Sequence, residues 1–278
     1  MPTTIELKSE AASLAPGALA TSDGSPFAVS TAEWRAVNDF VIGINSTDPG
    51  TTAEFTSLVP AYADLRKSSA AWPSQTLPNL IRLSQDIYQH GAVTVPNVYP
   101  KLEAMLQKWE TNSPSAADQQ DFQLLLKTVQ NSARTNASAA MAIVPALRSL
   151  MTAIEVTNQE FPNALASIMA GGFSPSGDPT HLSDAIIAAI NQMAANLARL
   201  AALLSVVQTP PVEDIERVEG AFTAIANDLD SLQSWVVTQI NDKVPVLGEL
   251  AIESAMQQWQ SVASEAQAFA ANAGSFSR

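Results

Sequence analysis

One segment, residues 118–161, limits the folds open to this chain more than any other. Apolar side chains recur in it at intervals of three and four residues, the spacing that places them on one face of an α-helix. They are Phe122, Leu125, Leu126, Val129, Ile143, Leu147, Leu150, Met151 and Ile154. At about 1.5 Å per residue, such a helix is on the order of 60 Å long, which predicts a rod-like body. Pro145 predicts a bend within it.

The same spacing predicts helices on the N-terminal side of this segment. One begins at Ser30 or Thr31, residue types that cap helix N-termini, and ends within residues 45–50. A second covers residues 52–69, with a kink at Pro60.

Prolines then interrupt the pattern. Pro73 and Pro78 predict a loop, because a residue that precedes proline disfavours the α conformation. A helix runs on from Pro78, with a kink or a short break expected within residues 91–100. Residues 111–115 are expected to form a turn.

The clearest break in the sequence is residues 169–180, which contain three glycines and two prolines. A fourth long helix is expected over residues 181–207, closed by a double proline. Residues 212–272 are predicted to be helical with one interruption at 243–248. No segment has the alternation of apolar and polar residues typical of a strand.

The sequence therefore predicts an all-α fold, an elongated bundle of about five long helices. Residues 1–30 are rich in Ala, Ser, Thr, Gly and Pro without sustained periodicity, so a flexible N-terminal arm with at most one short helix is expected there. Residues 31–278 are expected to form a single helical-bundle domain, with the elements of a small head region within 162–212. Trp72, Trp109, Trp235 and Trp259 are expected to pack in the core or at helix junctions.

Charge and cysteine content exclude several classes of function. The 278 residues include 27 acidic and 14 basic side chains, for a net charge of −13. A nucleic-acid-binding protein needs a basic surface to neutralise phosphates, so no nucleic acid is expected as a partner. The chain has no cysteine, which excludes disulfides and Cys-ligated metals. Residues 1–30 lack the pattern of a Sec signal peptide.

No residue pattern supplies a catalytic mechanism. The two histidines, His90 and His181, lie beside turns and are expected to be solvated or capping residues. Glu213, Asp214 and Glu216 follow a double proline, where acids favour a helix N-terminus. We therefore expect no enzyme activity, no cofactor and no metal site.

Three segments resemble the haemolysin BL and non-haemolytic enterotoxin family of α-helical pore-forming toxins, relatives of cytolysin A and the xenorhabdolysins. Residues 77–106 (LPNLIRLSQDIYQHGAVTVPNVYPKLEAML) look like the family's proline-leucine, Asn/Gln-rich helix and the tyrosine-leucine helix after it. Residues 121–161 are similar to its second long helix, with repeated Asn and Gln around a leucine ladder. Residues 249–269 (ELAIESAMQQWQSVASEAQAF) resemble its closing alanine-rich helix.

The resemblance implies a five-helix tail bundle, a head that enters membranes, and pores assembled from several protomers. The target-cell membrane and related toxin components, in homo- or hetero-oligomers, are then the expected partners. It also implies a soluble secreted form that later associates with the target membrane. The chain departs from the family in one respect, since it lacks an obvious hydrophobic tongue between the third and fourth long helices.

The best candidate for a membrane-inserting element is residues 183–208, which are long enough to cross a bilayer but amphipathic. Its apolar residues are Ile186, Ile187, Ile190, Met193, Leu197, Leu200, Leu203, Leu204, Val206 and Val207. The candidate hinge or head loop comprises Gly171, Gly172, Pro175, Gly177, Pro179, Pro210 and Pro211.

Three alternatives remain open. The amphipathic pattern of residues 183–208 favours a buried bundle helix as their role in the soluble form, and this role is compatible with later release and insertion. Residues 137–154 are a second candidate for insertion, although a core role is expected for them. Insertion can also belong to a partner component, to which this chain docks. The alternative to a toxin component is a non-lytic helical interaction or scaffold protein.

Overall fold

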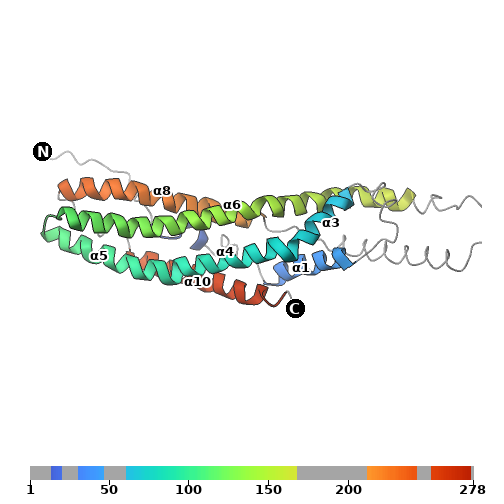
Figure 1. The fold of residues 1–278 in the computed structure, drawn as a ribbon, viewed down its shortest axis with the longest axis horizontal. Coiled ribbons are helices and arrows are strands. Elements are labelled where there is room, and N and C mark those ends of the chain that lie inside the picture. Colours follow the sequence, from blue (N-terminus) through green and yellow to red (C-terminus); the bar gives the residue numbers. More distant parts are fainter. Residues whose placement is uncertain (1–13, 21–30, 47–60, 168–211, 243–251, 277–278) are drawn as a thin grey trace, which may run out of the picture. The chain divides into compact units, whose positions relative to one another are not determined.

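The computed structural model describes residues 14–20, 31–46, 61–167, 212–242 and 252–276 (Figure 1), and every structural statement concerns them. In chain order the elements are the 3₁₀ turn η1 (Gly17–Ala20), α1 (Thr31–Ser46), α3 (Ala61–Ala71), η2 (Trp72–Thr76), α4 (Leu77–Gln89), η3 (His90–Thr94), α5 (Val95–Thr111), α6 (Ala116–Ser167), α8 (Val212–Asp242) and α10 (Ile252–Ala273). The described residues contain no strand. The prediction of an all-α bundle of long helices is confirmed.

The chain divides into two compact units. Unit 1 comprises Met1–Val29, Leu80–Ile143 and Glu213–Gly274, and unit 2 comprises Ser30–Asn79, Val144–Val212 and Ser275–Arg278. Three helices contribute to both units. α4 passes from unit 2 to unit 1 after Asn79, α6 passes from unit 1 to unit 2 after Ile143, and α8 passes from unit 2 to unit 1 after its first residue, Val212. The expectation of a single domain over residues 31–278 stays a prediction.

In unit 1, helices distant in sequence pack along one another (Figure 1). α8 is joined to α6 by the side chain of Gln130, which donates from Nε2 to the carbonyl of Ala226 at 3.1 Å. α10 packs against α5 and η3. The apolar faces of these helices form the core, which includes Leu102, Leu106, Phe122, Leu126, Val129, Ile215, Val218, Phe222, Leu229, Val262 and Phe269.

Unit 2 is held together by aromatic packing and one buried amide. α1 packs against α3, and the rings of Trp34 and Trp72 stack with centroids 6.4 Å apart. The buried Asn38 side chain accepts a hydrogen bond from Trp72 Nε1 at 3.1 Å and donates one to the carbonyl of Phe276 at 3.3 Å. A buried amide with both its oxygen and its nitrogen bonded avoids the penalty of an unpaired polar group.

The prediction of a loop between Pro73 and Pro78 is wrong. The chain stays helical from Ala61 to Thr111, and it passes through two π-turns, η2 and η3. In each π-turn a backbone N–H donates to the carbonyl five residues back: Leu77 to Trp72, and Val95 to His90. The kink or break expected within 91–100 is a change of helical register at η3, after which α5 continues to Thr111.

The π-turns explain how a helix accommodates these prolines. Proline has no N–H to donate, and in a regular α-helix its ring collides with the carbonyl four residues back. In a π-turn the backbone hydrogen bonds span five residues instead of four, so the carbonyl four residues back is no longer aimed at the proline ring. Pro73, Pro78 and Pro96 are exposed. Pro100 is also exposed but lies within the regular helix α5, beyond both π-turns. The carbonyl of Ser69, four residues before Pro73, accepts a bond from Asn45 Nδ2 at 2.8 Å.

The turn predicted at 111–115 is confirmed, because α5 ends at Thr111 and α6 begins at Ala116. Ser115 and Asp118 cap α6 reciprocally: the Asp118 N–H donates to Ser115 Oγ at 3.1 Å, and the Ser115 N–H donates to Asp118 Oδ2 at 3.0 Å. Hydrogen bonds from the Ser115 hydroxyl and then from Lys108 lower the pKa of Asp118 to about 2.

The other predicted helices are confirmed where the structure describes them, whereas the kink expected at Pro60 and the bend expected at Pro145 stay predictions. α1 begins at Thr31 and ends at Ser46, and α6 is helical through Pro145 over 52 residues. α8 and α10 cover the C-terminal region, and the interruption predicted at 243–248 lies outside the described residues. Trp72, Trp109 and Trp259 are buried as expected. The Trp235 side chain is outside the described set.

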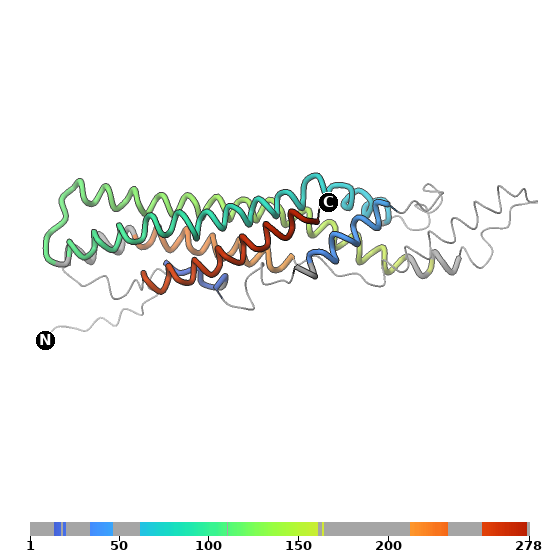
Figure 2. Tube along the Cα trace, turned by 90° about the horizontal axis from the view of Figure 1, so that it is seen from below, coloured from blue at the N-terminus to red at the C-terminus, as the bar shows by residue number. Residues whose placement is uncertain are grey.

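Part of the expected flexible arm is packed. Leu14 and Leu19 are buried, and the short turn η1 lies against α10 (Figure 2). For residues 14–20 the prediction of a flexible arm is therefore wrong, while the short helix expected in this region is present. Residues 1–13 and 21–30 lie outside the described residues.

Candidate functional site

The membrane-insertion and hinge residues predicted from the sequence lie outside the described part of the chain. Residues 183–208 and the loop residues from Gly171 to Pro179 belong to this group, as do Pro210 and Pro211. Their roles stay predictions. The second insertion candidate, residues 137–154, lies on α6 and is described.

Helix α6 is the described element with the composition of a membrane-crossing segment. Among the described helices it is the one long and apolar enough to span a bilayer, over Ala116–Glu160. Its apolar window is 44% buried, since Ile143, Leu147 and Leu150 point into the core. The core role expected for residues 137–154 is thus confirmed for these side chains, and other residues of the segment face outward.

Helix α6 carries one line of exposed, uncharged residues, beside which the exposed Lys127, Arg134 and Arg148 are charged. These residues recur at intervals of four and three: Leu124, Thr128, Asn131, Thr135, Ser138, Ala142 and Pro145. We call this set the uncharged stripe. Two large apolar side chains, Leu124 and Met141, are 56% and 57% exposed on this helix. Such spacing matches the contact face of one helix with another.

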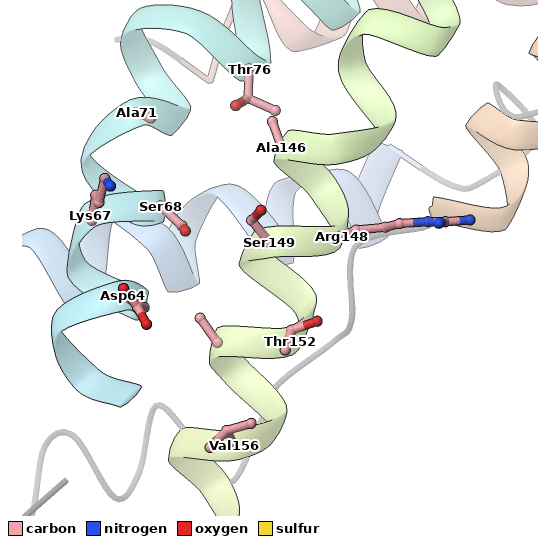
Figure 3. Close-up of a pocket in the computed structure, with 11 residues that line it drawn as sticks. Asp64, Lys67, Ser68, Ala71, Thr76, Ala146, Arg148, Ser149, Thr152 and Val156 are labelled. Carbon is pink, nitrogen blue, oxygen red and sulfur yellow. The ribbon is translucent and has the colours of Figure 1, made fainter. Parts of the chain in front are cut away.

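In unit 2 a groove of about 600 Å³ lies between α3–η2 and α6 (Figure 3). Asp64, Lys67 and Ser68 line it from α3, and Ser149 and Thr152 line it from α6. Figure 3 shows Arg148 extending away from α3. The remaining lining is largely small side chains. The groove combines one carboxylate and one ammonium group with hydroxyls, a set that does not define a reaction.

The acidic residues that follow the double proline lie where the sequence predicts. α8 begins at Val212 and carries Glu213 and Asp214 in its first turn, where carboxylates complement the positive end of the helix dipole. Asp214 also pairs with Arg217 one turn later. In the described ranges, no three His, Cys, Asp or Glu residues are grouped as a metal site.

One histidine contradicts the sequence expectation. His90 is 0% exposed rather than solvated, and it begins the π-turn η3. Its Nδ1 lies 2.8 Å from Ser132 Oγ of α6. The imidazole meets Phe222 of α8 at 5.3 Å and Trp259 of α10 at 4.5 Å, both edge to face. Burial lowers the pKa of His90 to about 3. His181 lies outside the described residues.

Gly91, the residue next to His90, lets η3 approach α10 closely. A Cβ atom at this position would stand 2.7 Å from the carbonyl oxygen of Trp259 and 3.0 Å from Cβ of Ala263. Only glycine fits that contact, so Gly91 determines how deeply His90 is seated against Trp259.

The cluster around His90 also holds the N-terminal segment. The carbonyl of Leu14 accepts a hydrogen bond from Trp259 Nε1 at 2.9 Å and another from Tyr99 Oη at 2.7 Å. Burial raises the pKa of Tyr99, which keeps it protonated as a donor. Trp259 therefore contacts His90 with its ring and Leu14 with its N–H.

Sequence reasoning missed this cluster because its members come from five separate segments. One signal was present: His90 follows Leu83 and Ile87 by seven and three residues, so it falls on the buried face of that helix. The neighbouring glycine and Pro96 favoured a turn instead.

No protein-family model matches the chain, and no curated protein matches it. Solved structures do match it. Two crystal forms of soluble SmhA, from the tripartite α-pore-forming toxin Smh of Serratia marcescens, are 14% identical to the chain and cover 95% of it, with a TM-score of 0.49. The match covers 96% and 97% of the two SmhA chains.

A triple head mutant of soluble AhlC, from the tripartite α-pore-forming toxin AHL of Aeromonas hydrophila, is also 14% identical. It covers 86% of this chain, and 98% of AhlC is matched, with a TM-score of 0.26. At these identities and TM-scores, the likeness is no evidence of a shared function.

Proposed function

We propose that this chain is a component of an α-pore-forming toxin, which binds a target membrane or partner subunits and oligomerises. The observation that carries the proposal is helix α6. It runs unbroken over 52 residues and packs with the other long helices of an all-α fold, the architecture that the sequence resemblance implies. The sequence resemblance of residues 77–106, 121–161 and 249–269 to the haemolysin BL family supports the same class.

The proposal places the chain in the class to which SmhA and AhlC belong by description, but it does not rest on that likeness. Its finer parts are a secreted soluble form, membrane entry by residues 183–208, and a hinge at 171–179 and 210–211. The net charge of −13 disfavours electrostatic attraction to anionic lipid. Membrane contact is therefore apolar or led by a receptor or a partner component.

The test is release of a trapped dye from liposomes and lysis of cells. The full chain is assayed alone and together with the proteins encoded beside it. Lysis in at least one combination is the expected result. Absence of both lysis and membrane association in every combination contradicts the proposal and leaves the alternative, a non-lytic helical interaction protein.

Two matched substitutions identify the inserting helix. Leu203→Asp places a charge in residues 183–208, and Met141→Asp places one on α6, at a side chain that is 57% exposed and so tolerates a charge in the soluble protein. A charge at the bilayer centre costs about 2.5–3.5 kcal/mol on insertion scales. We expect Leu203→Asp to abolish lysis and Met141→Asp to retain it.

The opposite result would assign insertion to α6. If both variants lyse as the unsubstituted chain does in combination with partner proteins, insertion belongs to a partner, and this chain is the docking component. Circular dichroism of each variant shows whether the helical fold is retained.

A further inference from the structure

The one described histidine is enclosed by uncharged groups. His90 faces Ser132 of α6, Phe222 of α8 and Trp259 of α10. Burial is the cause of its lowered pKa. Among the described residues hydrogen-bonded within this cluster, the other titratable side chain is Tyr99 on α5, which donates to the same Leu14 carbonyl as Trp259. Tyr99 stays neutral from pH 7 to pH 3, because burial raises its pKa.

We propose that unit 1 is an acid-sensitive device, in which uptake of a proton by His90 releases α10 and the N-terminal segment 14–20 from the rest of the unit. The proposal concerns the chain in solution and does not depend on its being a toxin component.

The geometry explains why a proton is not tolerated here. A neutral imidazole carries one N–H, and the Nδ1 atom of His90 is hydrogen-bonded to Ser132 Oγ. An imidazolium carries N–H groups on both ring nitrogens, and His90 Nε2 has no hydrogen-bond partner in the described part of the chain. A second N–H and a full charge would therefore be buried without compensation.

We expect α10 to be the helix that is released, because its Trp259 makes the shorter of the two aromatic contacts with His90, at 4.5 Å between ring centroids. Trp259 also holds Leu14 through its Nε1. Any movement that relieves the imidazolium at this contact breaks the Leu14 bond as well. The N-terminal segment is thus coupled to the protonation state of a residue more than 70 positions away.

The direction of the pH effect follows from the two pKa values. The pKa of His90 is about 3 in the folded chain and 6.5 ordinarily, so the unfolded form takes up the proton first. Stability is complete above pH 6.5 and is lost as the pH falls from 6.5 toward 3. Between pH 7 and pH 5, the folding equilibrium constant should fall by about 25-fold.

The experiment measures urea unfolding of the full chain at several pH values from 7 to 5, and hydrogen exchange of α10 amides corrected for the intrinsic rate. His90→Phe keeps an aromatic ring and cannot titrate. His90→Asn keeps a donor close to the position of Nδ1 and serves if the Phe variant does not fold. His181→Gln is the matched control, because the chain has only two histidines.

The expected result is a fall of about 25-fold in the folding equilibrium constant of the unsubstituted chain and of His181→Gln between pH 7 and pH 5, and no comparable fall in the His90 variants. Exchange should accelerate first in α10. The same pH dependence with and without His90 would overturn the proposal. So would an acid-induced loss of protection that is equal in α6, α8 and α10.

Discussion

Gly91 and His90 show how much one residue can determine in a bundle of long helices. The hydrogen atom of Gly91 allows the backbone of η3 to lie against α10, and this contact buries the imidazole beside it. In close-packed interiors, a single added methyl group forces neighbours to move.

Substitution of Gly91 by Ala should therefore destabilise the chain. Its Cβ would meet the Trp259 carbonyl oxygen at 2.7 Å, a backbone atom that cannot rotate away. We expect a loss of about 1–3 kcal/mol in the free energy of unfolding, measured by urea denaturation followed by Trp fluorescence.

Gly220→Ala is the matched control, because a Cβ at Gly220 meets nothing within 4 Å. That variant should gain about 0.5–1 kcal/mol, the usual difference between glycine and alanine in a helix. Equal effects of the two substitutions would contradict the close approach of η3 and α10.

At the scale of the element, prolines were the main source of error in predicting the fold. The 3–4 spacing of Leu80, Leu83 and Ile87 correctly predicts a helix. Pro73 and Pro78 predict a loop that the structure does not contain. A sequence does not show that a π-turn removes the steric conflict, nor that Asn45 from another helix bonds the Ser69 carbonyl. The sequence therefore predicts that this region is helical. Whether the helix continues through the prolines depends on contacts between segments, which the sequence does not show.

The Asn45–Ser69 bond can be tested with a double-mutant cycle. Asn45→Ala should cost about 1–2 kcal/mol, because it removes a partly buried hydrogen bond. Pro73→Ala restores a backbone N–H that can donate to Ser69, so the cost of Asn45→Ala should fall in that background. Thermal or urea unfolding of the four proteins gives the coupling.

Asn97→Ala, at an exposed position on α5, is the control for loss of an asparagine and should change stability by less than about 0.5 kcal/mol. Strictly additive effects of Asn45→Ala and Pro73→Ala would mean that a backbone N–H at residue 73 does not replace the Asn45 side chain as a donor to the Ser69 carbonyl.

At the scale of the whole molecule, the all-α class and the buried tryptophans followed from local patterns along the chain. The His90 cluster did not, because Leu14, Ser132, Phe222 and Trp259 are brought together only by folding. The candidate insertion and hinge residues stay predictions. Composition alone separates them from core residues poorly, since a buried bundle helix and an inserting helix share an amphipathic pattern.

Electron microscopy shows whether the chain forms part of a membrane pore, as we propose. The full chain is imaged on liposomes, alone and with the proteins encoded beside it. We expect ring-shaped assemblies on the membrane in at least one combination and none in solution without lipid or detergent. Unassembled chains that stay off the membrane in every combination would contradict it.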